Sequence, residues 1–271
     1  MILKHMNAIR RLVEEQKPLV HCITNPVSIN QCANAILSVG ARPMMAEHPL
    51  EVAEITATAQ ALVLNLGNIT DTRMKSMMIS SEVAVKNNIP FVIDLVGIAC
   101  SELRRQFAYE LIGKSIPMII KGNYSEINAL YNSAYKSAGV DADLSLDINS
   151  ISGVAVSLAR KYNTVILASG KTDIITDGKK FVYIKNGTHQ LTKVTGTGCM
   201  LGVLCGCYLS VCQNIYAAIT ACSVLGICGE LSVTDMGNGS FMVNLINNLS
   251  VLSNTYVGNY LKMEVTEIEK A

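Results

Sequence analysis

The amino-acid sequence predicts an α/β protein in which a mostly parallel central sheet is covered by helices on both faces. Short segments that are apolar throughout alternate with longer amphipathic segments along most of the chain. Strands that are apolar on both sides are typical of parallel sheets, because helices bury both of their faces. No segment resembles a linker or a low-complexity region. We therefore expect a single domain over residues 1–271.

The first elements of this pattern have well-marked ends. Residues 3–16 place apolar side chains at helical spacing with charged side chains opposite, which predicts a surface helix. Residues 18–24 form an apolar strand, in which His21 is expected to be a buried structural residue. A helix is expected over residues 28–39, and Gly40 follows it in the position of a C-terminal cap.

Further strands are expected along the chain, and helices separate most of them. The strands cover residues 43–46, 61–65, 90–94, 118–121 and 164–168. The helices cover residues 49–59, 72–86, 102–113, 125–133 and 148–162. After Gly170 a hairpin is expected, with strands at residues 174–176 and 180–184. From Thr197 to the end of the chain we expect only helix, with breaks near Gln213 and at residues 237–239.

Composition excludes several classes of function. Half of the residues are hydrophobic, 16% are charged and the formal net charge is +1, whereas a nucleic-acid-binding protein needs a basic face. The nine cysteines lie mostly in apolar segments, which favours reduced packing residues and a cytoplasmic protein. Residues 1–17 are amphipathic and the apolar runs are interrupted, so we expect neither a signal sequence nor a membrane-spanning run. The apolar bias also favours a homo-oligomer.

A glycine turn at residues 195–198 organises the candidate site. Gly196 and Gly198 alternate with Thr195 and Thr197, and a long run of small and apolar residues follows at once. This pattern predicts a tight turn that leads into a buried helix. The first turn of such a helix directs unpaired backbone N–H groups and the positive end of the helix dipole at one spot, where a phosphate can bind. The alternative is that the glycines simply mark the start of a helix and bind no anion.

Polar residues gather at the ends of the predicted strands. In parallel sheets of this type, ligands bind beyond the carboxyl ends of the strands. The residues expected at that edge are Asn25, Met45 with Glu47 and His48, Asn65 with Gly67, Asp94, Asn123 with Glu126, Ser169 with Gly170, and residues 195–199. We expect this set to converge on one site.

Asp94, Asn123 and Glu126 follow neighbouring strands and are candidates for a metal site. Carboxylate and amide oxygens suit Mg²⁺, which is held partly through water and partly through substrate phosphates. The alternative for Asn123 and Glu126 is structural. Asn at a helix N-cap, with Glu three residues later, is the pattern of a capping box.

Three further residues each carry two interpretations. Lys121, at a strand end, is either a solvated charge or the partner of a nucleotide phosphate. Ser169 either begins the hairpin loop or contacts the nucleotide. Cys199 is either a small packing residue or a general base, because the dipole favours an ionised thiol in the first turn of a helix. A modest base is enough for phosphoryl transfer, in which positioning and charge stabilisation supply most of the catalysis.

These residues stand in motifs that follow one another with regular order and spacing. The motifs are PLVHCITN at residues 18–25, GARPMM at 40–45, NLG at 65–67, DLVG at 94–97, KGNYSE at 121–126 and VTGTGC at 194–199. Over about residues 15–255 the chain resembles the hydroxyethylthiazole kinases of the ribokinase-like superfamily. The resemblance implies a three-layer ribokinase-like sandwich. It also implies a homotrimer with active sites at subunit interfaces.

The activity implied by the resemblance is phosphorylation of the primary alcohol of 4-methyl-5-(2-hydroxyethyl)thiazole, with ATP and Mg²⁺, in thiamine salvage. By position, Met45 and Gly196 contact the thiazole, and Lys121 and Ser169 contact ATP. Lys121 stands where many relatives have Arg and Ser169 where many have Thr, and both keep the needed donor. Cys199 occupies the position of the superfamily's catalytic aspartate.

The resulting hypothesis arranges the site around the glycine turn, with the ATP phosphates above it. Asp94 and Glu126 hold Mg²⁺, and the alcohol lies near Cys199 in line with the γ-phosphate. Backbone N–H groups of residues 196–199 stabilise the transferring group. The ATP side also includes Asn123, Thr195, Thr197 and Gly198, and the substrate side also includes Asn25, Asn65 and Gly67.

Two other interpretations stay open from the sequence. A hydroxymethylpyrimidine kinase or an ATP-dependent hydrate repair dehydratase shares the superfamily, but those relatives normally carry Asp where this chain has Cys199. A catalytically silent nucleotide sensor that has lost its base also fits a cysteine at that position. A coupled ATPase assay with and without the thiazole alcohol separates the sensor from the kinase.

Overall fold

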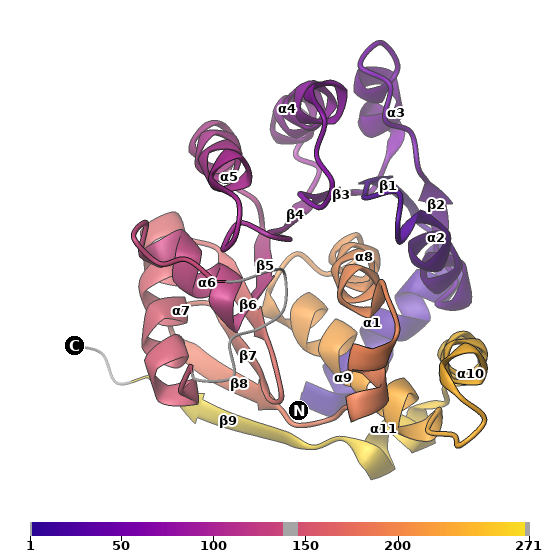
Figure 1. Ribbon diagram of the computed structural model, residues 1–271. Coiled ribbons are helices and arrows are strands. Elements are labelled where there is room, and N and C mark those ends of the chain that lie inside the picture. The colour runs from indigo at the N-terminus through magenta and orange to yellow at the C-terminus, as the bar shows by residue number, and fades with distance from the viewer. Residues whose placement is uncertain (1, 138–145, 269–271) are drawn as a thin grey trace.

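The computed structural model describes residues 2–137 and 146–268, and within them one sheet of nine strands lies between two layers of helices (Figure 1). The strand order is β2-β1-β3-β4-β5-β6-β7-β8-β9. The pairs from β2 to β6 are parallel, and the pairs from β6 to β9 are antiparallel. The predicted α/β class with a mostly parallel sheet is confirmed.

The parallel strands agree with the sequence prediction to within two residues at each end. They are β1 (Leu19–Ile23), β2 (Arg42–Met44), β3 (Ala61–Asn65), β4 (Phe91–Asp94), β5 (Ile119–Asn123) and β6 (Val165–Ser169). β3 and β4 are buried along their whole length, as their apolar sequences require when helices cover both faces. Asn65 and Asp94 are therefore the last, buried residues of two adjacent strands.

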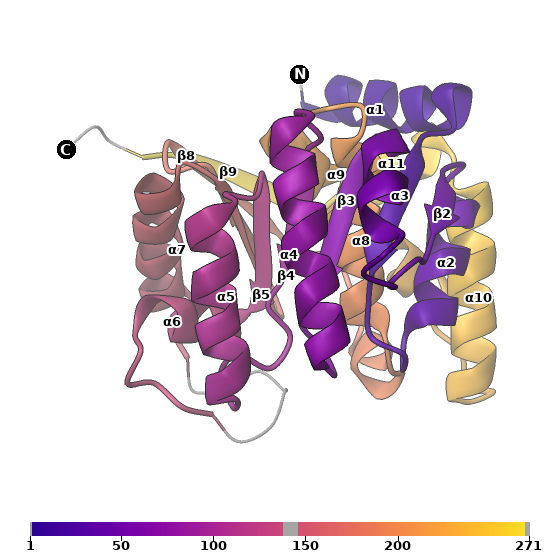
Figure 2. The same cartoon turned by 90° about the horizontal axis from the view of Figure 1, so that it is seen from above.

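The antiparallel edge contains one error of prediction. β7 (Asp173–Thr176) and β8 (Lys180–Ile184) form the expected hairpin. The expectation of helix to the end of the chain is wrong, because β9 (Met263–Glu267) pairs with β8 (Figure 2). The open edge of β8 offers backbone partners, and the β-branched residues Val265 and Thr266 favour an extended strand there.

Helices cover both faces of the sheet (Figures 1 and 2). One layer contains α3 (Val52–Thr58), α4 (Asp71–Lys86), α5 (Glu102–Lys114), α6 (Tyr124–Tyr131) and α7 (Ile148–Tyr162). The other contains α1 (Ile2–Gln16), α2 (Ile29–Ser38), α8 (Thr197–Leu209), α9 (Ile215–Leu231), α10 (Asn238–Val251) and α11 (Asn254–Tyr260), with a short 3-10 turn, η1 (His189–Lys193), before α8. Each face of the sheet has its own hydrophobic core. Within the described ranges, none of the helices combines the length and hydrophobicity that a bilayer crossing needs.

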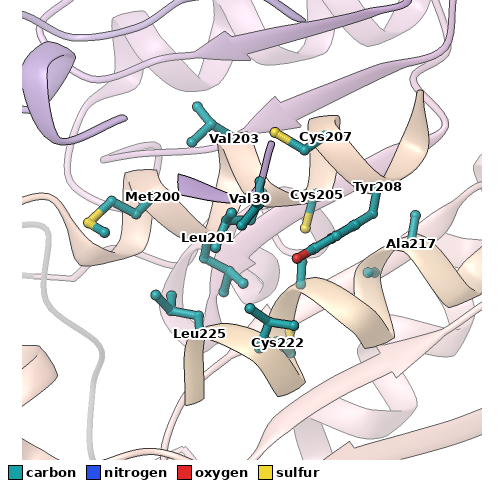
Figure 3. Packing of buried hydrophobic residues seen from close by; sticks show 14 of the residues in the cluster. Val39, Met200, Leu201, Val203, Cys205, Cys207, Tyr208, Ala217, Cys222 and Leu225 are labelled. Atoms are coloured by element: carbon teal, nitrogen blue, oxygen red, sulfur yellow. The ribbon is translucent and has the colours of Figure 1, made fainter. Parts of the chain in front are cut away.

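The helix that carries the glycine turn, α8, packs directly on the sheet. All its residues from Met200 to Leu209 are buried. Gly206 permits this contact, because a Cβ there would collide with the side chain of Val63 on β3. Figure 3 shows Leu201, Cys205 and Tyr208 of α8 near Cys222 and Leu225 of α9, and all five side chains belong to one core cluster. All nine cysteines are unpaired and six are buried, so most are packing residues, as predicted.

Candidate active site

The glycine turn forms the start of α8 at the carboxyl edge of the sheet, as predicted. Gly196 is the N-cap residue, with a φ of +95°, a left-handed conformation that favours glycine. A Cβ at this position would lie 3.0 Å from the Cβ of Ser28, so a side chain here would be crowded. Gly196 has no side chain that could cap α8. The first backbone N–H groups of α8 are therefore suited to bind an anion.

A buried ion pair lies against this helix start. Lys121, on β5, donates from Nζ to Oδ1 of Asp94, at the end of β4, over 2.8 Å, and the two side chains are only 4% and 0% exposed. A Cβ on Gly198 would lie 3.6 Å from Lys121 Nζ. The solvated alternative for Lys121 is therefore wrong. Its ammonium and the positive end of α8 act on the same space, and both favour an anion there.

The three charged groups of this region perturb one another. Burial alone would lower the pKa of Lys121, but the carboxylates of Asp94 and Glu126 outweigh it and raise the pKa, so the ammonium stays charged. Burial raises the pKa of Glu126 to about 7, against the opposing effect of Lys121. Burial also raises the pKa of Asp94, while Lys121 and Asn65 counteract this shift. Two carboxyl groups with raised pKa beside one cation form an unusually concentrated charge cluster.

Glu126 and Asn123 form a capping box at the start of α6, which confirms the structural alternative for this pair. The Glu126 backbone N–H donates to Asn123 Oδ1 over 2.9 Å, and the Asn123 backbone N–H donates to Glu126 Oε2 over 2.7 Å. The other carboxylate oxygen, Oε1, accepts the Gly97 N–H over 2.8 Å. Glu126 therefore ties the loop after β4 to the start of α6.

Two asparagines hold Cys199 on the other side of Asp94. Asn65 Nδ2 donates to Asp94 Oδ2 over 2.9 Å and to Cys199 Sγ over 3.3 Å. Asn25 Nδ2 donates to the same sulfur over 3.2 Å and to Asn65 Oδ1 over 3.1 Å. Cys199 is partly exposed, unlike the buried cysteines that follow it in α8. The structure thus brings four predicted site residues, Asn25, Asn65, Asp94 and Cys199, into one hydrogen-bonded group.

Met45 lies on the loop after the edge strand β2. Its side chain is partly buried and packs against the same core cluster as Cys199. His21 fastens this loop, because its Nε2 lies 2.9 Å from the carbonyl oxygen of Ala46 and its Nδ1 lies 2.9 Å from Thr56 Oγ1. The predicted burial of His21 is confirmed.

The predicted nucleotide residues lie at the ends of β5 and β6 and around the glycine turn. Ser169 is paired in register with Asn123, and its hydroxyl donates to the Gly122 carbonyl oxygen over 3.3 Å. Thr197 Oγ1 donates to the Leu191 carbonyl oxygen over 2.8 Å, so this hydroxyl helps to hold the turn. Thr195 is exposed to solvent.

Sequence reasoning missed Arg73, a buried residue of α4. Its Nη1 donates to the carbonyl oxygens of Gly67 and Asn68 over 3.1 and 2.7 Å, and its Nη2 donates to that of Thr24. Its Nε lies 3.3 Å from Glu47 Oε2. Arg73 therefore fastens the loops after β1, β2 and β3. The one available signal was its place on the core-facing side of α4, one turn from the buried Met77.

Tyr124 was missed as well. Its hydroxyl donates to the Thr172 carbonyl oxygen over 2.6 Å. Its ring lies against Gly170, where an added Cβ would come within 2.8 Å of ring atoms. Tyr124 therefore shapes the loop that follows Ser169. Its position inside the KGNYSE motif was the available signal.

A lysine ammonium, two carboxyl groups and a helix start converge at the carboxyl edge of a mostly parallel sheet, where α/β proteins bind phosphorylated ligands. The fold is shared with the solved structure of the pyridoxal kinase from Staphylococcus aureus in complex with AMP-PCP and pyridoxal. That likeness has a TM-score of 0.61 at 15% identity, over 93% of this chain and 99% of that chain, and it shows the fold alone. The predicted fold class, a ribokinase-like three-layer sandwich with a mostly parallel central sheet, is confirmed.

The sequence narrows this class to one family. Residues 10–255 match the hydroxyethylthiazole kinase family, and the chain belongs to it. Hydroxyethylthiazole kinase 2 of Clostridium botulinum is 44% identical over 254 residues, which cover 92% of this chain and 96% of the relative. The solved hydroxyethylthiazole kinase protein from Pyrococcus horikoshii OT3 has a TM-score of 0.89 at 30% identity, over 97% of this chain and 100% of that chain. The resemblance stated from the motifs is confirmed.

Proposed function

We propose that this protein transfers the γ-phosphoryl group of ATP to the primary alcohol of 4-methyl-5-(2-hydroxyethyl)thiazole, which yields the thiazole phosphate for thiamine salvage. Membership of the hydroxyethylthiazole kinase family supports the substrate. The observation that carries the phosphoryl chemistry is the buried Lys121–Asp94 pair against the first turn of α8. A cation held at a helix N-terminus is suited to bind and stabilise a transferring phosphoryl group.

On the nucleotide side, the ATP phosphates lie over the glycine turn. Lys121 and the backbone N–H groups of residues 196–199 balance the charge that develops on the transferring group. Lys121 is well placed for this role because its ammonium is already oriented by Asp94. The remaining contacts to ATP come from Ser169, Asn123, Thr195, Thr197 and Gly198.

Asp94 and Glu126 fit a Mg²⁺ ion that is held mainly through water. Both offer hard carboxylate oxygens. Protein donors already occupy part of each group: Lys121 and Asn65 bond to Asp94, and two backbone N–H groups bond to Glu126. Within the described part of the chain, no three His, Cys, Asp or Glu side chains form a ready cage for a metal. The bound ion supplies charge neutralisation for the ATP phosphates.

On the substrate side, the thiazole alcohol lies among Met45, Gly196, Asn25, Asn65 and Gly67, with its hydroxyl beside Cys199. The hydroxyl oxygen attacks the γ-phosphorus, its proton passes to the ionised Cys199 sulfur to give the thiol, and ADP leaves. The partly exposed position of this sulfur at the start of α8 supports the assignment. A weak base is sufficient when positioning and charge stabilisation supply most of the rate enhancement.

We also propose a cytoplasmic homotrimer with its active sites at subunit interfaces. Apolar side chains are exposed on neighbouring elements, since Leu37 of α2 is 56% exposed and Val243 of α10 is 60% exposed. Figure 1 shows α2 and α10 on the same side of the molecule. Exposed apolar surface of this kind is typical of subunit contacts. Light scattering should give three times the chain mass of 29.2 kDa, and a monomer contradicts the trimer.

A coupled assay with ATP and Mg²⁺ over a panel of thiazole and pyrimidine alcohols tests the proposed function. We expect phosphorylation of the hydroxyethylthiazole and little turnover of hydroxymethylpyrimidine. Preference for the pyrimidine contradicts the assigned substrate. ATP binding without turnover of any alcohol indicates a nucleotide sensor instead.

A further inference from the structure

We propose that Asn25 and Asn65 are positioning residues whose two side-chain amides form a fixed cradle of N–H donors for the Cys199 sulfur. In this amide cradle, both residues act on the reaction through the sulfur, not by hydrogen-bonding the thiazole alcohol. The inference rests on the proposed function and refines it, because it separates these two residues from those that touch the substrate.

The hydrogen-bonding capacity of Asn65 is fully used inside the protein. A side-chain amide has two N–H bonds and two acceptor sites. The N–H bonds of Asn65 go to Asp94 Oδ2 and Cys199 Sγ, over 2.9 and 3.3 Å. Its oxygen accepts the Gly67 backbone N–H over 2.9 Å and Asn25 Nδ2 over 3.1 Å. A hydrogen bond to substrate would require Asn65 to break one of these four bonds.

The hydrogen-bonding capacity of the Asn25 side chain is also fully used inside the protein. Its two N–H bonds go to Asn65 Oδ1 and Cys199 Sγ, over 3.1 and 3.2 Å. Its oxygen accepts the backbone N–H and the hydroxyl of Ser28, both over 3.2 Å. Both asparagines are also buried. Each therefore has the bonding pattern of a support for other groups, not of a ligand contact.

The orientation of both amides is locked. If either amide turned over, its oxygen would face the Cys199 sulfur and its NH₂ group would face backbone N–H donors. Gly67 closes the remaining space, because a Cβ there would lie 2.9 Å from Asn25 Nδ2 and 2.9 Å from Asn65 Oδ1. Arg73 also holds this region, because it donates to the carbonyl oxygen of Thr24, which precedes Asn25, and to that of Gly67.

This arrangement dictates how the sulfur can react. Two N–H groups donate to Cys199 from the protein side, so its remaining bonding direction is turned away from them. A proton that moves between the sulfur and the substrate hydroxyl must therefore do so on that open side. Fixing a reacting atom within a narrow range of directions is worth large factors in rate, and misplacement by about 1 Å can cost about 100-fold.

A double-mutant cycle in the full-length protein tests the cradle. Asn25→Ala and Asn65→Ala are each made in the wild type and in Cys199→Ala, and kcat and KM for the thiazole alcohol are measured for all variants. Asn25→Ala is the more direct arm, because among the described residues the Asn25 side chain bonds only to Ser28, Asn65 and Cys199. It removes no hydrogen bond to Asp94, and it tests the proposal even if Asn65→Ala fails to fold.

We expect Asn25→Ala to lower kcat by up to about 10-fold in the wild type, no more than the loss of the sulfur itself, and to change KM less than about threefold. In the Cys199→Ala background the same substitution should lower kcat less than about threefold, because the sulfur through which it acts is gone. An equal loss of kcat in both backgrounds overturns the proposal. So does a large rise in KM with kcat preserved, since that result indicates direct substrate binding.

Asn186→Ala is the matched control. Asn186 is also a buried asparagine whose amide bridges distant segments, with Nδ2 donating to the Tyr260 carbonyl oxygen and Oδ1 accepting the Lys262 N–H, both over 2.7 Å. It should lower the melting temperature and leave kcat and KM unchanged. Wild-type protein that fails to phosphorylate the thiazole alcohol contradicts the proposed function itself, which is a different outcome from any result of the cycle.

Discussion

The two sides of Asp94 are built on different physical principles. On one side, Lys121 and Glu126 form a buried cluster of charges. On the other side, Asn65 and Asn25 form a neutral amide cradle. A buried charge depends on compensation, and removing its partner is expensive. A neutral hydrogen-bonded cradle depends on direction, so its loss affects rate more than stability.

Asp94→Ala should have the largest effect, because it leaves the Lys121 ammonium buried without its partner. We expect loss of activity and a fall of about 3–5 kcal/mol in the free energy of unfolding, measured by urea titration. The matched control is Glu264→Ala, which removes the partner of Lys185 from an exposed ion pair. That change should stay within about 0.5 kcal/mol. If the two variants lose similar free energy of unfolding, the Lys121 side of Asp94 does not depend on charge compensation.

Gly196→Val should abolish phosphorylation, because it disturbs both sides at once. The left-handed backbone at φ +95° strains any β-branched residue, and the new Cβ would lie 3.0 Å from the Cβ of Ser28, which supports Asn25. Gly198→Ala is the comparison variant, since its Cβ would meet Lys121 Nζ at an ordinary 3.6 Å. Kinase assays and circular dichroism check both. Full activity in Gly196→Val would show that the phosphate does not bind at the glycine turn.

Gly67→Ala should break the neutral side alone. The added methyl group would press on both amides of the cradle, while the ion pair of Lys121 and Asp94 keeps its partners. We expect kcat to fall about 10-fold and ATP affinity to be retained. Gly153→Ala is the control, because its Cβ would meet nothing within 4 Å and alanine favours the helix. Loss of ATP binding in Gly67→Ala shows that the two sides are not separable.

Cys199→Ala should lower kcat only about 10-fold, because positioning and charge stabilisation remain. Cys199→Asp should keep or raise turnover, since a carboxylate accepts the same two N–H donors and is a competent base. Steady-state kinetics of the wild type, Cys199→Ala and Cys199→Asp test whether Cys199 acts as the base. An Asp variant that folds but does not turn over removes Cys199 from the role of base.

The sequence was most informative where structure depends on neighbouring residues. Apolar runs and helical periodicity identified the parallel strands and their helices, because both patterns reflect burial of local segments. β9 escaped prediction because it is defined by the distant strand β8, with which it pairs. The glycine turn was predicted for the same local reason as the helices: Gly196 precedes a continuous apolar run.

The candidate site was predictable as a list of residues but not as a set of contacts. Strand ends identified Asn25, Asn65 and Asp94, because parallel strands end at one edge. The bond from Asn25 to Cys199 joins residues 174 positions apart, and nothing in either local sequence indicates it. Arg73 was missed for the same reason, since its partners are backbone carbonyl groups of loops that converge only in the folded chain.

The smallest effect we predict concerns His21, which fastens the loop that carries Met45. The Ala46 carbonyl oxygen can only accept, so Nε2 carries the proton and Nδ1 accepts from the Thr56 hydroxyl. Burial lowers the pKa of His21 in the folded protein, whereas the pKa of this side chain in the unfolded chain is about 6.5. The unfolded state therefore binds a proton at His21 that the folded state does not, and the contribution of His21 to stability falls as the pH drops below about 6.5.

Urea titrations at about pH 7.5 and 5.5 measure this dependence. The raised pKa of Glu126, about 7, acts in the opposite direction over the same range. The test is therefore the difference between proteins: from about pH 7.5 to 5.5 the wild type should lose more, or gain less, free energy of unfolding than His21→Gln, which lacks the buried imidazole. His48→Gln, at an exposed position, should show the same change with pH as the wild type. If His21→Gln keeps the whole pH dependence, other groups cause it. The imidazole would then be a purely geometric support for the loop that carries Met45.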